Sequence, residues 1–147
     1  MKRDIFIAGI IQGSCRGKDI FDQNYRRRLT ILLRKALPKS NVFCPVEEHP
    51  QSVDYASVKA RDVFFDLMNR AAKSDILVAF LPQASLGTAI ELWQAHQAKK
   101  IIFTISPMTE NWVIKFLTNK NFLTLEDFEK FVTSGAFRNF VEEHNGK

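Results

Sequence analysis

A glycine-rich segment near the N-terminus, residues 9–18 (GIIQGSCRGK), contains the residue types of an anion-binding loop. Gly9 and Gly13 allow a ligand to approach the backbone closely, and backbone N–H groups beside a helix start suit an anion. The spacing is neither that of a Walker loop nor the GxGxxG of a dinucleotide loop. A surface loop without a ligand explains the segment equally well, so it indicates an anion site only together with other segments.

Glu91 is the carboxylate whose surroundings best suit chemistry. The segment PQASLGTAIELWQA, residues 82–95, places Ser85, Gly87 and Thr88 ahead of a helix whose first turn would carry Glu91. One interpretation is a capping box, in which Thr88 and Glu91 satisfy free backbone donors at the helix start. The other is that Glu91 points into a cleft, ready to act as a nucleophile or a base. Spacing alone leaves both interpretations open.

The elements that must position these residues follow from the hydrophobic pattern. Continuous apolar runs predict strands buried on both faces, at 4–11, 42–46, 76–81 and 101–105. Apolar residues at near-helical spacing predict helices at 19–37, 57–73 and about 88–98, with Arg26, Arg27 and Arg28 solvated on the first of them. Further helices are expected at 112–117, 125–133 and 137–143.

This alternation predicts an α/β fold, a single-domain Rossmann- or flavodoxin-like sandwich over residues 1–147. Its mainly parallel sheet would have about four to five strands flanked by helices, followed by a helical C-terminal extension over 108–147. In such sheets ligands bind beyond the carboxyl ends of the strands. The loops 10–19, 47–56 and 82–88 are therefore expected to surround the site.

Composition excludes several classes of protein. The chain has 147 residues, 46% of them apolar and thirteen of them phenylalanine, which predicts a folded core rather than disorder. No apolar run reaches the roughly 18 residues of a membrane helix, and three scattered histidines predict no metal site. Two cysteines suggest reduced thiols and a cytoplasmic protein. The run 5–11 resembles part of a lipoprotein signal, but a first strand explains it better.

The net charge of +5 favours anionic partners without naming them. The run Arg26, Arg27 and Arg28 could suit nucleic acid, but no recognition motif accompanies it, so we expect no nucleic-acid partner.

Three segments resemble the nucleoside 2-deoxyribosyltransferase superfamily, and within it most closely the nucleoside 5′-monophosphate N-glycosidases. They are IFIAGIIQGS (5–14), AAKSDILVAFLPQASLGTAIELWQA (71–95) and KKIIFTISP (99–107), and the resemblance covers about residues 4–107. It implies that Glu91 attacks the anomeric carbon of a deoxyribose and passes the sugar to water or to another base, without a cofactor. A second acid usually lies on the preceding helix, where Asp66 is the candidate and Asp62, one turn earlier, the alternative.

The resemblance also implies how the substrate is bound. Ser85 stands where transferases have an aspartate and monophosphate-cleaving relatives a serine, which removes charge repulsion against a phosphate. Phe6 stands where many relatives have a tyrosine that orients the nucleophile. The expected substrate-binding residues are Phe6, Gly9, Gly13, Ser14, Arg16, Ser85, Gly87 and Thr88.

The expected function is cleavage of the N-glycosidic bond of a (2′-deoxy)nucleoside 5′-monophosphate, by hydrolysis or by deoxyribosyl transfer. One alternative is base exchange on unphosphorylated deoxynucleosides. Another is a catalytically inactive nucleotide-binding module, which Phe6 and the spacing of Asp66 favour. The resemblance further implies a homodimer or higher homo-oligomer with a shared active site, to which Ser106 and Asn111 would contribute.

Overall fold

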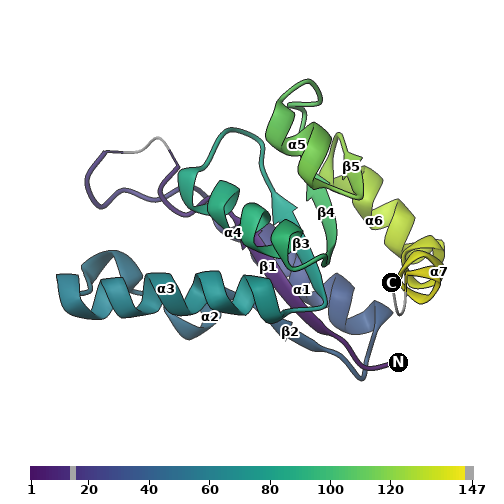
Figure 1. The fold of residues 1–147 in the computed structure, drawn as a ribbon, viewed down its shortest axis with the longest axis horizontal. Helices are drawn as coiled ribbons and strands as arrows, with labels where there is room; N and C mark the ends of the chain where they lie inside the picture. Colours follow the sequence, from purple (N-terminus) through teal and green to yellow (C-terminus); the bar gives the residue numbers. More distant parts are fainter. Residues whose placement is uncertain (14–15, 145–147) are drawn as a thin grey trace.

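The computed structural model describes residues 1–13 and 16–144 (Figure 1). Its centre is a parallel five-stranded sheet with the order β2-β1-β3-β4-β5 among the described residues. The strands are β1 (Asp4–Gly9), β2 (Asn41–Phe43), β3 (Ile76–Phe80), β4 (Ile101–Ile105) and β5 (Lys120–Phe122). The order reverses direction between β1 and β3, which is where open α/β sheets bind ligands. The predicted fold class is confirmed.

Helices cover both faces of the sheet because alternate strand residues point to opposite sides (Figure 1). Ile5, Ile7 and Phe103 pack in one core, with α1 (Asn24–Ala36), α6 (Leu125–Thr133) and α7 (Ala136–Glu143). Phe6 and Ala8 pack in the other, with α3 (Ser57–Lys73), α4 (Leu86–Gln97) and α5 (Trp112–Leu117). No helix in the described part of the chain is long and apolar enough to cross a membrane.

Two strands differ from the prediction. β2 ends at Phe43 because Pro45 opens the short helix α2 (Pro45–Glu48); proline lacks the N–H that a sheet needs but suits the first position of a helix. A 3-10 turn, Ser52–Asp54, follows before α3. The C-terminal extension is not wholly helical, since β5 pairs with β4. Its three residues are too few to show a strand period in the sequence.

Candidate active site

A cavity of about 340 Å³ lies at the carboxyl edge of the sheet, between the loop after β1, helix α3 and the start of α4. The cavity brings six of the predicted site residues together, although they come from segments far apart in the chain. They are Gly9, Gly13, Ser85, Gly87, Thr88 and Glu91. The remaining lining residues are Ile11, Gln12, Phe64, Leu67, Met68 and Leu86. The surface is mostly apolar, and Glu91 is the one carboxylate on it among the described residues.

Helix α4 presents Glu91 to this cavity one turn further along than the sequence suggests. Ser85 is the N-cap, and its Oγ accepts a hydrogen bond from the Thr88 N–H at 3.4 Å. The helix therefore begins at Leu86, and Glu91 is its sixth residue rather than a member of the first turn. The capping-box interpretation of Thr88 and Glu91 is wrong, so capping does not explain this carboxylate.

The surroundings of Glu91 disfavour its charged form. Glu91 is 8% exposed, and no described residue donates a hydrogen bond to its carboxyl group. Burial raises the pKa of Glu91 to about 8, and the positive charge of Arg26 opposes part of this rise. A carboxyl group that titrates near neutral pH is typical of catalytic sites, because it can change its protonation state during a reaction.

Arg26 is the site residue that the sequence analysis missed. The solvated position expected for it is wrong, because its side chain is only 4% exposed. Its guanidinium donates to the carbonyl oxygens of Ile7 and Gly9, at 3.2 and 2.9 Å. Arg27 is exposed as expected, and Arg28 pairs with Glu129 at 2.9 Å on the surface. Helical spacing could have found it, because Arg26 lies three and seven residues before the buried Leu29 and Leu33 and therefore shares their face of α1, unlike Arg27 and Arg28.

Three predicted residues lie elsewhere, and a fourth is outside the described part of the chain. Phe6 is fully buried in β1, with its ring centroid 5.3 Å from that of Phe43, and does not line the cavity. Arg16 is exposed and is not among the described lining residues, and Ser14 lies outside the described residues. Asp66 is exposed on α3, where its carboxylate pairs with Arg70 at 2.9 Å.

The turn of helix α3 explains the place of Asp66. Successive helical residues are rotated by about 100°, so Phe64, Leu67 and Met68 share the face that lines the cavity, while Asp66 points away from it. Asp62 is also exposed and is not among the lining residues. The structure therefore does not bring a second acid from α3 to Glu91.

We expect Asp66→Asn to change the catalytic activity less than about threefold, because the side chain does not reach the cavity. The free energy of unfolding should fall by only about 0.5 kcal/mol, which is typical of an exposed ion pair four residues apart on a helix. Steady-state kinetics and urea denaturation of the two proteins check both statements. A loss of a hundredfold or more in kcat would show that Asp66 takes part in the reaction.

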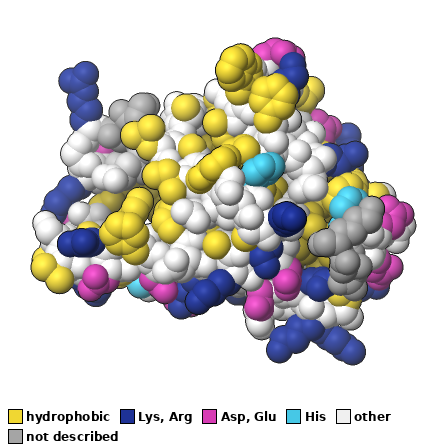
Figure 2. Space-filling model, in the orientation of Figure 1, with side chains coloured by type: hydrophobic (Ala, Val, Ile, Leu, Met, Phe, Trp, Pro, Cys, Tyr) yellow, Lys and Arg dark blue, Asp and Glu magenta, His cyan; other side chains and the backbone are white. Residues whose placement is uncertain are grey.

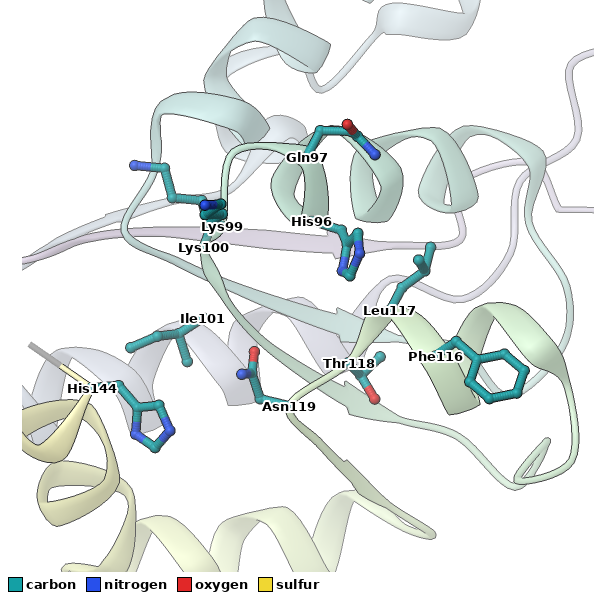
Figure 3. A pocket seen from close by; sticks show the side chains of 10 residues that line it. All are labelled: His96, Gln97, Lys99, Lys100, Ile101, Phe116, Leu117, Thr118, Asn119 and His144. Atoms are coloured by element: carbon teal, nitrogen blue, oxygen red, sulfur yellow. The ribbon is translucent and has the colours of Figure 1, made fainter. Parts of the chain in front are cut away.

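A larger cavity, of about 540 Å³, lies at the opposite edge of the sheet, where β4 and β5 begin (Figure 3). His96, Lys99, Lys100 and His144 lie around it, and its described lining residues include no carboxylate. The described residues around it therefore supply no carboxylate nucleophile. In the described part of the chain, no three His, Cys, Asp or Glu side chains lie close enough together to hold a metal ion.

No family model matches this chain, and no curated protein matches its sequence. Similar solved structures include one of a 2-deoxyribosyltransferase from Bacillus psychrosaccharolyticus, with a TM-score of 0.63 and 22% identity over 86% of this chain and 90% of that one. Another is of a conserved protein from Enterococcus faecalis V583, with a TM-score of 0.64 and 18% identity over 91% of this chain and 99% of that one. At these identities the similarity concerns the fold. This chain has the flavodoxin-like α/β fold that a 2-deoxyribosyltransferase also has.

Proposed function

We propose that this protein belongs to the nucleoside 2-deoxyribosyltransferase superfamily and cleaves the N-glycosidic bond of a (2′-deoxy)nucleoside 5′-monophosphate. The observation that carries the proposal is Glu91, a buried carboxylate in a cavity at the carboxyl edge of a parallel sheet. Glu91 does not cap helix α4, and burying a carboxylate costs free energy, so a function in the cavity is the better explanation of its position. The similarity in fold to a 2-deoxyribosyltransferase supports the same class of reaction.

In the proposed reaction, a carboxylate oxygen of Glu91 attacks C1′ of the sugar. The bond between C1′ and the base nitrogen breaks, and its electron pair leaves with the base, which takes a proton from water. Attack of water on the glycosyl ester then releases the sugar phosphate and regenerates the carboxylate, while a second base in place of water would give transfer. Covalent catalysis of this kind divides one difficult displacement into two easier ones.

The start of α4 supports a phosphorylated substrate. A helix N-terminus favours an anion, and here it opens directly into the cavity through Ser85, Gly87 and Thr88. A Cβ atom on Gly87 would meet no atom of the described residues outside its own stretch of helix within 4 Å, so the described part of the fold does not require glycine there. We propose that a ligand occupies this space, and that Arg16 and Ser14 of the first loop add to phosphate binding.

Two other functions are candidates: base exchange on unphosphorylated deoxynucleosides, and nucleotide binding without catalysis. Base exchange on unphosphorylated deoxynucleosides would use the same nucleophile, and the 2-deoxyribosyltransferase of similar fold is a biocatalyst for the synthesis of nucleosides. A nucleotide-binding module without activity is favoured by Phe6, which has no hydroxyl to orient Glu91, and by the exposed position of Asp66.

Chromatography of released base distinguishes these functions. The protein is incubated with a panel of ribo- and deoxyribonucleoside 5′-monophosphates and the matching nucleosides, beside Glu91→Gln as the control. We expect free base from monophosphates with the natural protein alone, and faster than from nucleosides. Release that appears only when a second base is added would instead indicate transfer. Binding without release of base from any substrate would support the inactive module.

We also propose that the protein forms a homodimer through an apolar face on α4 and α5. Leu86, Ile90 and Trp93 lie along the outer side of α4, and Leu86 is 88% exposed. Trp112, 77% exposed, and Phe116 extend the face on α5, and Figure 2 shows hydrophobic side chains gathered over this side. Because Leu86 also lines the cavity, a partner on this face would help to close the active site.

The double variant Ile90→Glu/Trp93→Glu should therefore be monomeric, because two charges would have to be buried in the interface. Sedimentation velocity at several concentrations measures the change. Ile31→Glu, at an exposed position on the opposite side of the sheet, is the matched control and should leave the dimer intact. A natural protein that stays monomeric at high concentration would contradict the proposal.

A further inference from the structure

Arg26 completes the carboxyl end of the central strand β1, where the neighbouring strand is missing. β2 pairs with β1 only as far as Phe43 opposite Phe6. Odd-numbered carbonyls of β1 face this side, since the Arg3 carbonyl accepts from the Asn41 N–H at 2.8 Å. Beyond the end of β2, the carbonyls of Ile7 and Gly9 accept from Arg26 instead.

The guanidinium of Arg26 is held in one position. Its Nε donates to Oε1 of Gln23 at 2.7 Å, and its Nη1 lies 3.8 Å from the Sγ of Cys44. Gln23 is held in turn, because its amide nitrogen donates to the carbonyl of Ile10 at 2.9 Å. The charge of this buried cation is not neutralised by an ion pair with any described side chain, because its donors are fixed on neutral carbonyl oxygens.

That charge lies beside the cavity of Glu91. Gly9, whose carbonyl accepts from Nη2 of Arg26, lines the cavity together with Glu91. The ring of Tyr25 lies directly against Gly9, where it would collide with any larger side chain, and its hydroxyl donates to the carbonyl of Ile10 at 3.0 Å. Arg26 and Tyr25, both buried, thus cover the end of β1 on the side away from the cavity.

We propose that Arg26 is a positioning residue that stabilises the charged form of Glu91 and holds the end of β1 beside it. The proposal rests on Glu91 being the nucleophile. An opposite charge in a poorly solvated region favours ionisation of a carboxyl group. The positive charge of Arg26 would stabilise the Glu91 carboxylate electrostatically. A tyrosine hydroxyl at the position of Phe6 would have stabilised it by a hydrogen bond.

The other titratable groups around Glu91 do not provide this stabilisation. Tyr25 is neutral, because burial raises the pKa of its hydroxyl. Helix α3 packs against α4, but none of its charged side chains lines the cavity. Asp66 pairs with Arg70 on the exposed side, and the exposed Arg61 lies 6.0 Å from the ring centroid of Phe65. In the loop after β1, Lys18 pairs with Asp54 at 3.0 Å. Arg26 is the buried cation that acts on Glu91.

The experiment is an NMR titration of side-chain carboxyl carbons in protein labelled with ¹³C-glutamate, with the Glu91 signal identified by its absence from Glu91→Gln. We expect Arg26→Gln to raise the midpoint of the Glu91 titration by about one pH unit. Arg26→Lys, which keeps the charge, should leave the midpoint within about 0.3 unit of the natural value. Arg27→Gln is the matched control at an exposed position.

Kinetics give a second readout. With a midpoint one unit higher, kcat/KM of Arg26→Gln should fall about tenfold at pH 7 and only about twofold at pH 9. A residue with only a structural role would lower activity by the same factor at every pH. If Arg26→Gln does not fold, Gln23→Ala replaces it, since it removes the acceptor that holds Nε and should raise the midpoint in the same direction.

The NMR titration and the assay of base release test different statements, so failure of the role of Arg26 can be distinguished from failure of the proposed function. A folded Arg26→Gln protein whose Glu91 midpoint is unchanged would overturn the role of Arg26, even if the natural protein releases base. Absence of base release would overturn the proposed function, while the titration, which needs no substrate, would still report on the two side chains.

Discussion

Replacing Glu91 with glutamine should abolish base release, with a fall in kcat of at least about a thousandfold, because the substitution removes the proposed nucleophile. The amide has nearly the same size and fits the same cavity, so the fold and the binding of nucleotide should persist. Chromatography of released base measures the rate, and calorimetry measures the affinity. A variant that binds nucleotide but retains a tenth of the activity would exclude Glu91 as the nucleophile.

If Glu91 is the nucleophile, base release by the natural protein should also depend on pH. Because burial raises the pKa of Glu91 to about 8, the attacking carboxylate forms as the pH rises through that value. We therefore expect kcat/KM to increase about tenfold per pH unit below pH 7 and to level off above pH 9. A profile that falls over this range would mean that the reaction needs the protonated carboxyl group.

Stability should change with pH in the opposite direction. The folded protein holds the Glu91 proton more tightly than the unfolded chain, where the pKa is about 4.3. Its contribution to stability is therefore complete below that value and is lost as the pH rises through about 8. Urea denaturation should show a decline of up to about 1.4 kcal/mol per pH unit in the free energy of unfolding. Glu91→Gln should remove that part of the decline.

The largest effect on stability is expected from Phe103→Ala, which should lower the free energy of unfolding by about 3 to 5 kcal/mol. Phe103 lies in the middle of β4 and is fully buried. Its ring centroid is 5.3 to 6.5 Å from those of five other phenylalanines, which belong to β5, α6 and α7: Phe122, Phe128, Phe131, Phe137 and Phe140. Truncation leaves a void where the C-terminal helices meet the sheet.

Urea denaturation followed by circular dichroism measures this loss. Phe65→Ala makes the same chemical change at a half-exposed position on α3 and should cost less than about 1 kcal/mol. Equal losses in the two variants would show that the aromatic cluster around Phe103 does not anchor the C-terminal helices.

Much of the fold follows from the sequence, because parallel strands are buried on both faces and appear as continuous apolar runs. The runs around Ile5 and Ile76 predict strands buried on both faces, and the loops that follow parallel strands are expected to meet at the carboxyl edge of the sheet. That rule was enough to place Gly9, Ser85 and Glu91 near one another. β5 was missed because three residues carry no period, and its place depends on Phe122 reaching Phe103.

The sequence by itself determined four of the strands, their order along the chain and the edge of the sheet that holds the cavity, since burial leaves a pattern in residue types. Only the tertiary structure decided which polar side chains share that cavity. Helix rotation turned Asp66 outward, the Ser85 cap moved Glu91 to the second turn of α4, and the early end of β2 left the carbonyls of Ile7 and Gly9 to accept from Arg26. These outcomes depend on the rotation of a helix and the length of a strand, which differ by single residues and leave the hydrophobic pattern unchanged.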